Sequence, residues 1–448
     1  MSRGFATDAV HAGYDIDSNK HAASVPIYAT AAFDMADALN GDALAAGQRQ
    51  GFSYSRVANP TVDILERRLA ALEGGESAVA VASGMAAVSY ALLCAAEGGG
   101  RIISPTDLYG ASVDAMETFF PQFGIHTDFV RDINDLDEVK AAIGPDTRCI
   151  FAESVANPST AVTDIAALAK LAHDHGIPLI VDNTVPTPYL LRPIEFGADI
   201  VVHSTTKGIT GHGNALGGVI VDAGNFDWDN GRFPQLTQDE LVISDERNGE
   251  WKSFVSAFGR QAFIRRIRTK YLRTFGAVES PFNAYLHLIG LETLPQRVRQ
   301  EVASATAIAE HLTHTPHVTQ VNYSGLALVA GVRTDHPDAV FRNDDGRQEA
   351  LVRKYLPEGV GTILSFLVEG DETHVSRIMD AVRVFTYIPN IGDARSLIVN
   401  PARITHREVP TRYREAAGVT DNLIRLSIGL ENVDDLIADL DQAIAEAY

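Results

Sequence analysis

Short apolar runs alternate with amphipathic segments from residue 61 to about residue 225. The segment 61–75 carries apolar residues three or four positions apart, which is the spacing of a helix, and it ends in two glycines. The runs predicted as strands are 78–83, 101–105, 126–130, 148–154, 177–184, 198–204 and 217–222. Apolar strands separated by helices predict an α/β fold with a mainly parallel, seven-stranded sheet covered on both faces.

A chain of 448 residues is too long for one compact core, so several domains are expected. Residues 1–60 lack sustained periodicity and are interpreted as an N-terminal arm. Residues 61–280 contain the predicted sheet, and residues 281–448 mix strands and helices and predict a smaller C-terminal α/β domain. The segment 251–299 is helical in pattern and is expected to bridge the two domains, whereas the charged segment 333–352 is expected to be exposed.

The charge and the cysteine content narrow the function classes. The formal net charge is −21, which disfavours binding to nucleic acid or to an anionic membrane. Cys94 and Cys149 stand in apolar runs and are interpreted as core residues rather than a disulfide pair. The chain shows neither a signal pattern nor an apolar run of the ~18–20 residues that a membrane span needs. We therefore expect a cytoplasmic protein. The charge favours solubility and does not specify a reaction.

Polar residues follow several predicted strands at the point where each strand ends. Ligands of a parallel sheet bind beyond these carboxyl ends, so we expect the side chains to converge on one rim. They are Ser83, Gly84 and Met85 after the first strand, Asn157 after the fourth, Asp182 and Thr184 after the fifth, and Ser204, Thr206 and Lys207 after the sixth.

Lys207 and Asp182 together suggest pyridoxal 5′-phosphate (PLP). Lys207 stands among hydroxyl side chains and glycines, and its amine could form a Schiff base with the aldehyde of this cofactor. A carboxylate such as Asp182 is costly to bury without a cation, and the pyridinium nitrogen of PLP is such a cation. The alternatives are a surface lysine in a loop and, for Asp182, a helix cap or a metal ligand.

Four further groups could hold the phosphate or the ring of such a cofactor. Ser83-Gly84-Met85 opens a predicted helix, whose N–H groups attract an anion, although a simple cap by Ser83 is the alternative. Ser204 and Thr206 could donate hydroxyl groups to the same phosphate. Arg56 in the arm could reach a phosphate of a neighbouring subunit or be an ordinary surface residue. Tyr109 could stack on a flat ring or be a half-buried core residue.

Competing cofactors are not supported by the residue spacing. The histidines at positions 173, 175, 203 and 212 match no zinc motif, so no metal is expected. The glycine-rich string 211–218 follows Lys207 rather than a strand, which argues against a dinucleotide.

Nearly the whole chain resembles the Cys/Met metabolism PLP-dependent family of fold type I. The resemblance is carried by HSTTKGITGHG around Lys207, IPLIVDNT before it, and YSRVANPT near the start. It implies that Lys207 carries the cofactor, that Asp182 pairs with its ring nitrogen, and that Tyr109 stacks on the ring. The residues it assigns to the phosphate are Gly84, Met85, Ser204 and Thr206, with Tyr54 and Arg56 from the partner subunit.

The resemblance also implies how the substrate is held. Asn157 is expected near the phenolic oxygen of the cofactor. Arg425, in LIRLSIGLE, matches the arginine that grips the substrate carboxylate, and Ser396 in GDARSLI is expected beside it. Shared active sites in a homotetramer, a dimer of dimers, follow from the same family pattern.

Within the family, the loop DAGNFDWDNGRFP and the string NIGDARSLI look like the O-acetylhomoserine sulfhydrylase branch of methionine biosynthesis. This implies γ-replacement on O-acetyl-L-homoserine by sulfide or a thiol, which releases acetate. The alternatives are a γ-lyase, although Ala111 replaces the cysteine typical of methionine γ-lyase, and γ-replacement with another acyl group or nucleophile. Gly208, where a bulky aromatic residue is usual, and Arg403, expected near the substrate entrance, depart from the pattern.

Overall fold

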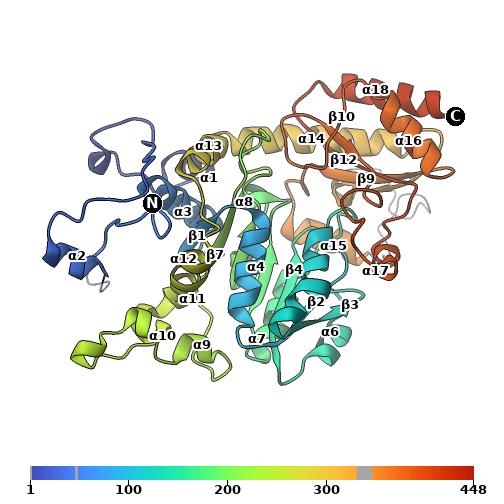
Figure 1. The fold of residues 1–448 in the computed structure, drawn as a ribbon. Helices are drawn as coiled ribbons and strands as arrows, with labels where there is room; N and C mark the ends of the chain where they lie inside the picture. Colours follow the sequence, from blue (N-terminus) through green and yellow to red (C-terminus); the bar gives the residue numbers. More distant parts are fainter. Residues whose placement is uncertain (1–2, 46–48, 330–345) are drawn as a thin grey trace.

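The computed structural model describes residues 3–45, 49–329 and 346–448. Its larger sheet has the strand order β1-β7-β6-β5-β4-β2-β3, in which β7 runs antiparallel to both of its neighbours and the other pairs are parallel (Figure 1). The strands are β1 Ser77–Val81, β2 Gly100–Pro105, β3 Ile125–Val130, β4 Thr147–Glu153, β5 Leu179–Asp182, β6 Ile200–His203 and β7 Gly218–Asp222. The mainly parallel seven-stranded sheet is confirmed.

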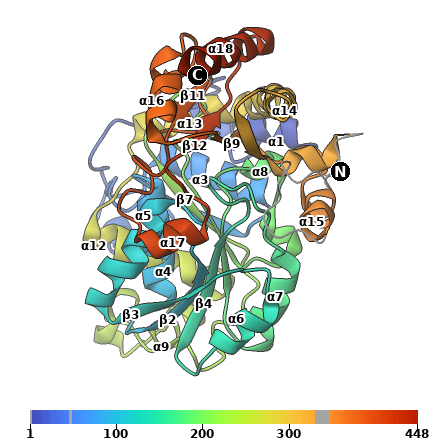
Figure 2. The ribbon, with the colours of Figure 1, turned by 90° about the vertical axis from the view of Figure 1, so that its right-hand side faces the viewer.

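Helices cover both faces of this sheet, because alternate residues of each strand point to opposite sides. In β1, Ala78 and Ala80 join one apolar core, whereas Val79 and Val81 join the other. Figure 2 shows α4 and α7 on opposite sides of the strands. The helices around this sheet are α3 Pro60–Glu73, α4 Gly84–Ala95, α5 Gly110–Asp114, α6 Leu136–Ala142, α7 Ile165–Asp174 and α8 Thr187–Leu190.

A second sheet of five strands has the order β10-β11-β12-β9-β8 and is antiparallel except for the pair β10–β11. Its strands are β8 Val318–Asn322, β9 Ile363–Val368, β10 Thr386–Tyr387, β11 Leu397–Val399 and β12 Leu423–Ser427. The helices of this part are α15 Arg347–Tyr355, α16 Glu372–Ala381, α17 Thr411–Ala416 and α18 Val433–Ala447. The charged segment predicted as exposed is only partly described. Residues 333–345 lie outside the described residues, and the prediction is wrong at α15, where Leu351 and Val352 are buried.

The long helix α14, Leu294–Leu312, connects the two sheets, as Figure 1 shows in yellow. Leu294 and Val298 pack in a core of the first sheet, and Ile308 and Leu312 pack in the core of the second. The connection is made by α14, which starts within the segment 251–299 predicted to bridge the domains but reaches the second core through residues beyond position 299. The predicted segment is broken into several helices. They are α10 Phe254–Phe258, α11 Ala262–Arg266, α12 Arg273–Phe275, α13 Pro281–Glu292 and α14. The domain boundaries predicted at residues 60 and 280 stay predictions.

The N-terminal segment, predicted as an arm, contains α1 Phe5–His11 and α2 Ala38–Ala45. Its start is tied to the first domain, because Arg68 Nε donates to the carbonyl of Ala12 (2.9 Å). Short 3₁₀ and π turns complete the described chain: Asp17–Asn19, Ala115–Phe119, Phe120–Phe123, Pro193–Phe196, Leu241–Ile243, Glu246–Asn248, Gly259–Gln261, Ile267–Leu272 and Ser324–Leu328.

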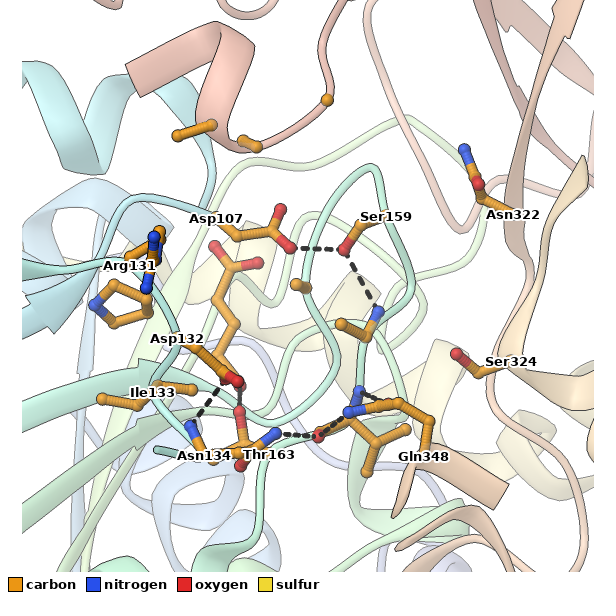
Figure 3. Close-up of a pocket in the computed structure, with 18 of the residues that line it drawn as sticks. Asp107, Arg131, Asp132, Ile133, Asn134, Ser159, Thr163, Asn322, Ser324 and Gln348 are labelled. Atoms are coloured by element: carbon orange, nitrogen blue, oxygen red, sulfur yellow. Dashed lines mark hydrogen bonds between the residues drawn. The ribbon is translucent and has the colours of Figure 1, made fainter. Parts of the chain in front are cut away.

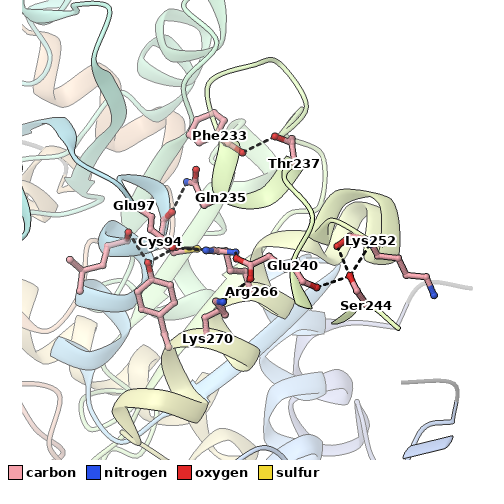
Figure 4. Close-up of polar contacts among 12 residues, drawn as sticks. Cys94, Glu97, Phe233, Gln235, Thr237, Glu240, Ser244, Lys252, Arg266 and Lys270 are labelled. Carbon is pink, nitrogen blue, oxygen red and sulfur yellow. Dashed lines mark hydrogen bonds and ion pairs between the residues drawn. The ribbon is translucent and has the colours of Figure 1, made fainter. Parts of the chain in front are cut away.

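The insertion after β7, residues 223–253, contains α9 Pro234–Thr237 and is held by two kinds of contact. Trp228 is buried and stacks on Phe263, with ring centroids 4.7 Å apart. Arg266 Nε donates to Glu97 Oε2 (2.8 Å) and its Nη1 to Glu240 Oε1 (3.0 Å), as Figure 4 shows. Because Glu240 belongs to the insertion, the buried guanidinium fixes this segment to the first domain.

No helix among the described residues is long and apolar enough to cross a membrane. Cys94 and Cys149 are both buried, as the apolar runs around them predict.

Candidate active site

A cavity of about 320 Å³ opens beyond the carboxyl ends of β4, β5 and β6, and it is closed on the far side by residues of the second domain. Its lining contains most of the residues that sequence reasoning selects for a PLP site. These are Ser83, Gly84, Met85, Tyr109, Asn157, Asp182, Thr184, Ser204, Thr206, Lys207 and Arg425. The rim expected from the strand ends thus exists as one connected space.

Lys207 lies in the turn that follows β6. Its Nζ donates to Asn390 Oδ1 (2.5 Å), which comes from the loop between β10 and β11. Burial, and then the guanidinium of Arg425, lower the pKa of Lys207 to about 8. A larger fraction of this amine is therefore neutral and nucleophilic near pH 7 than of an exposed lysine.

Thr184 connects Asp182 to the turn that carries Lys207. The hydroxyl and the backbone N–H of Thr184 donate to Asp182 Oδ1 (2.5 and 3.0 Å), and the same hydroxyl accepts from the N–H of Ser204 (2.9 Å). Burial raises the pKa of Asp182, so a cation facing this carboxylate is needed to keep it ionised.

The start of α4 forms a cradle for an anion. Ser83 caps the helix by accepting from the N–H of Ala86 (3.1 Å). A Cβ at Gly84 would lie 2.5 Å from the Cβ of Ser204, so only glycine allows this close approach. On the other side, Thr206 Oγ1 donates to the carbonyl of Gly217 (3.2 Å) and accepts from its N–H (3.0 Å). Ser83, Ser204 and Thr206 line the same cavity as this helix start, and such a helix N-terminus suits a phosphate.

Tyr109 and Asn157 share one support. The backbone N–H groups of Tyr109 and Asn157 donate to the two carboxyl oxygens of Glu153, at 2.6 and 3.1 Å. Burial raises the pKa of the Tyr109 phenol. Tyr109 is 40% exposed and lines the cavity.

Arg425, in the middle of β12, is the cation that the second domain contributes. Its Nη1 donates to Asn157 Oδ1 (3.2 Å) and its Nη2 to the carbonyl of Asn390 (3.0 Å). The Nε of Arg425 is buried and has no hydrogen-bond partner among the described residues. Burial lowers the pKa of Arg425 to about 10, which leaves the side chain charged at neutral pH.

Three predicted site residues lie outside the cavity that the described residues form. Tyr54 is 46% exposed, and the guanidinium of Arg56 lies 5.4 Å from its ring centroid. Ser396 is fully buried, and its hydroxyl donates to Glu431 Oε2 (2.8 Å) instead of facing Arg425 in the cavity. The hydroxyl of Ser396 is therefore engaged by Glu431, and the expected contact of Ser396 with the substrate stays a prediction.

The two departures from the family pattern have different surroundings. A Cβ at Gly208 would lie 2.9 Å from Thr187 Cγ2, so the local packing disfavours a larger residue here. Arg403 does not itself line the Lys207 cavity, although Thr405, two residues along the chain, does, and the expected place of Arg403 near the substrate entrance stays a prediction. Arg403 pairs with Glu372 and lines a separate cavity with Arg407 and Arg414.

Several cavity residues were not predicted from the sequence. Glu153 ends β4 as Asp182 ends β5, so the strand-end argument could have found it. Asn390 and Thr405 belong to irregular loops of the second domain, where no periodic pattern marks them. His406 lies next to Thr405 and donates from Nε2 to the carbonyl of Leu108 (3.1 Å), which holds the loop against the segment that carries Tyr109.

A second cavity, of about 180 Å³, is lined by both polar and apolar residues of the two domains (Figure 3). There Ser159 donates to Asp107 Oδ2 (2.5 Å), and Gln348 exchanges hydrogen bonds with the backbone of Val162. Among the predicted site residues, none lines this second cavity as the described residues form it. No group of three or more metal-ligating side chains occurs among the described residues.

Residues 6–445 match the family of Cys/Met metabolism PLP-dependent enzymes. The chain belongs to this family. Its cofactor is therefore PLP, and the residues of the first cavity fit it: a buried lysine with a lowered pKa, a buried carboxylate that needs a cation, and an anion cradle at a helix start.

Full-length relatives support the same assignment. Sulfhydrylase FUB7 of Gibberella moniliformis is 41% identical over 99% of this chain and 98% of its own, and the O-acetyl-L-homoserine sulfhydrylase of Leptospira meyeri is 38% identical over the same shares. The crystal structure of a Campylobacter jejuni protein named as an O-acetylhomoserine (thiol)-lyase has a TM-score of 0.90 and 35% identity. It covers 99% of this chain and 100% of its own, and it contains N′-pyridoxyl-lysine-5′-monophosphate.

Proposed function

We propose that this enzyme replaces the γ-acetoxy group of O-acetyl-L-homoserine by sulfide or a thiol. The Cγ–O bond breaks and acetate leaves, and a Cγ–S bond forms to give homocysteine or a thioether such as methionine. The observation that carries the proposal is the convergence of Lys207, Asp182, Tyr109 and Arg425 on one cavity. The names of the sulfhydrylase relatives supply the acyl group and the sulfur nucleophile.

PLP supplies an electron sink for a carbanion at the substrate Cα. Lys207 would hold the cofactor covalently, Asp182 would keep its ring nitrogen protonated, and Tyr109 would stack on its ring. Thr184 would orient Asp182, and Asn157 would lie near the phenolic oxygen. The phosphate would be held by Ser83, Gly84, Met85, Ser204 and Thr206.

Arg425 would bind the substrate carboxylate. Its terminal nitrogens are already placed by Asn157 and Asn390, so the guanidinium is held before the substrate arrives. Its unpartnered Nε adds a free donor in a buried site, where a charge-assisted hydrogen bond is strong. This grip orients the substrate so that the Cα–H bond faces Lys207.

Lys207 Nζ would take the proton from Cα and return a proton later in the cycle. The lowered pKa of about 8 suits this work, because a general acid–base group is most effective when its pKa lies near the working pH. Tyr109 lies across the same cavity, and its hydroxyl can assist departure of the carboxylate leaving group.

A second copy of the chain would complete the site. Tyr54 and Arg56 are exposed and lie outside the cavity of their own chain, where Arg56 Nη1 donates to the carbonyl of Arg273. In a neighbouring subunit these two side chains would reach the phosphate. A site shared in this way requires at least a dimer, and the homotetramer stays a prediction. The cytoplasmic location stays a prediction.

The reaction is tested by assaying two products with the purified enzyme. Homocysteine is expected from O-acetylhomoserine only when sulfide is added, with little 2-oxobutanoate. Formation of 2-oxobutanoate and ammonia at the same rate with or without sulfide would identify a γ-lyase instead. Comparing O-acetyl-, O-succinyl- and O-phosphohomoserine with sulfide tests the acyl group, and the acetyl ester should give the highest kcat/KM.

A further inference from the structure

The buried carboxyl group of Glu153 binds the backbone of two residues that line the proposed cofactor cavity, Tyr109 and Asn157. Glu153 is 6% exposed, and each of its two oxygens accepts a backbone N–H: Oε1 that of Tyr109 and Oε2 that of Asn157. Tyr109 follows β2 and Asn157 follows β4, so the carboxyl joins two separate chain segments at the rim of the sheet.

Burying the carboxyl group of Glu153 at this position costs folding free energy. Glu153 pairs with Asp182 across β4 and β5, so two carboxyl groups lie side by side in a buried region. Burial, and then the charge of Asp182, raise the pKa of Glu153 well above its usual range. The two N–H donors offset part of this cost, and both belong to residues that line the cofactor cavity.

We propose that Glu153 is a positioning residue that sets Tyr109 and Asn157 against the cofactor and the substrate. The inference rests on the proposed function, in which Tyr109 stacks on the ring and Asn157 lies beside it. Asn157 Oδ1 also accepts from Arg425 (3.2 Å), so Glu153 joins the ring-facing side chain to the group that grips the substrate carboxylate.

The segment that carries Tyr109 is held by a second hydrogen bond, which does not involve Glu153. His406 Nε2 donates to the carbonyl of Leu108 (3.1 Å), and burial lowers the pKa of His406 to about 4, so this bond is unaffected by pH in the working range. Loss of one hydrogen bond at Glu153 should therefore shift Tyr109 without unfolding the segment.

The test is a double-mutant cycle on cofactor affinity. Glu153→Gln keeps one acceptor and presents an NH₂ group to the other N–H. The PLP dissociation constant is measured by resolving the holoenzyme and titrating PLP back, for the wild type, E153Q, Tyr109→Ala and the double variant. E153Q should weaken PLP binding about 10-fold in the wild-type background and less than about threefold in the Tyr109→Ala background. An equal loss in both backgrounds would overturn the proposal.

A second cycle addresses the substrate side. E153Q should raise the KM for O-acetylhomoserine, and this increase should disappear in the Asn157→Ala background; an increase that persists there counts against the proposal. If E153Q lowers the unfolding temperature by more than about 4 °C, Glu153→Asp, which retracts the carboxyl, replaces it under the same criteria. A wild-type protein that binds no PLP would refute the proposed function itself, independently of either cycle.

Discussion

Lys207 donates a hydrogen bond of 2.5 Å to Asn390, so the two domains meet at the reactive nitrogen. Lys207 follows a strand of the first sheet, whereas Asn390 lies in a loop of the second. The carbonyl of Asn390 also accepts from Arg425 (3.0 Å). Asn390 thus contacts both the cofactor-binding lysine and the arginine proposed to bind the substrate. These contacts hold the Lys207 amine in position even without cofactor or substrate.

The lowered pKa of Lys207 predicts the pH dependence of cofactor uptake. Only the neutral amine attacks the aldehyde. Because the pKa of Lys207 is lowered from 10.5 to about 8, the neutral amine forms at a lower pH than it does in a free lysine. The rate at which apoprotein takes up PLP, followed by absorbance, should therefore rise with pH through a midpoint near 8. Arg425→Met removes the second cause of the lowering and should move the midpoint upward. A midpoint near 10 in the wild type would contradict the burial of this amine.

Thr184 predicts a loss of cofactor affinity that depends on its hydroxyl. Thr184→Val removes the donor to Asp182 and the acceptor for Ser204 N–H, and leaves both groups short of a partner. We expect PLP to bind about 10-fold more weakly, since a hydrogen bond to a charged group contributes about 1.5 kcal/mol or more. Thr184→Ser keeps the hydroxyl and is the matched control, which should bind PLP almost as the wild type does.

Glu301, on α14, predicts a pH-dependent stability. Neither carboxyl oxygen has a hydrogen-bond partner among the described residues, and burial raises the pKa of Glu301 from 4.5 to about 7 against the opposing charge of Arg297. The folded state therefore binds the proton more tightly than the unfolded state. The free energy of unfolding should fall as pH rises from about 4.5 to about 7, by roughly 3 kcal/mol from this group.

Glu301→Gln removes that contribution. Urea unfolding of both proteins across this pH range should give stabilities that differ little near pH 4.5 and favour the variant above pH 7. Parallel pH profiles of the two proteins would show that Glu301 has a partner or an ordinary pKa.

The insertion 223–253 should depend on the guanidinium of Arg266. Arg266→Met leaves Glu97 and Glu240 without their buried cation and should destabilise the protein by roughly 3 kcal/mol. Lys270→Met removes a more exposed cation from the same Glu240 and should cost less than about 1 kcal/mol. Thermal unfolding and limited proteolysis within the insertion measure both effects. Equal losses in the two variants would mean that burial does not distinguish these ion pairs.

The sequence predicts the half of the site that the first sheet provides, because strand ends mark it. Asp182 and Lys207 each follow an apolar run, and the carboxyl ends of neighbouring parallel strands lie on one edge. Asn390 is different: it lies in an irregular loop, and its contact with Lys207 spans 183 positions, which no local pattern encodes. Arg425 was placed by resemblance alone, since within β12 it is one buried residue among apolar neighbours.

Ser396 and the N-terminal arm show two other limits of predicting the site from the sequence. The sequence pattern around Ser396 cannot reveal that its hydroxyl donates a hydrogen bond to Glu431, because that partner depends on how β11 and β12 pack. Tyr54 and Arg56 do not line the cavity of their own chain, and their proposed partner is a second chain that a single sequence does not display.

Reduction of the holoenzyme with borohydride tests most directly whether Lys207 binds the cofactor. Peptide mass spectrometry of the reduced protein should find the reduced cofactor on Lys207, and Lys207→Ala should lose both this label and turnover. Cofactor fixed to another lysine, or full turnover by Lys207→Ala, would contradict the assignment of the site.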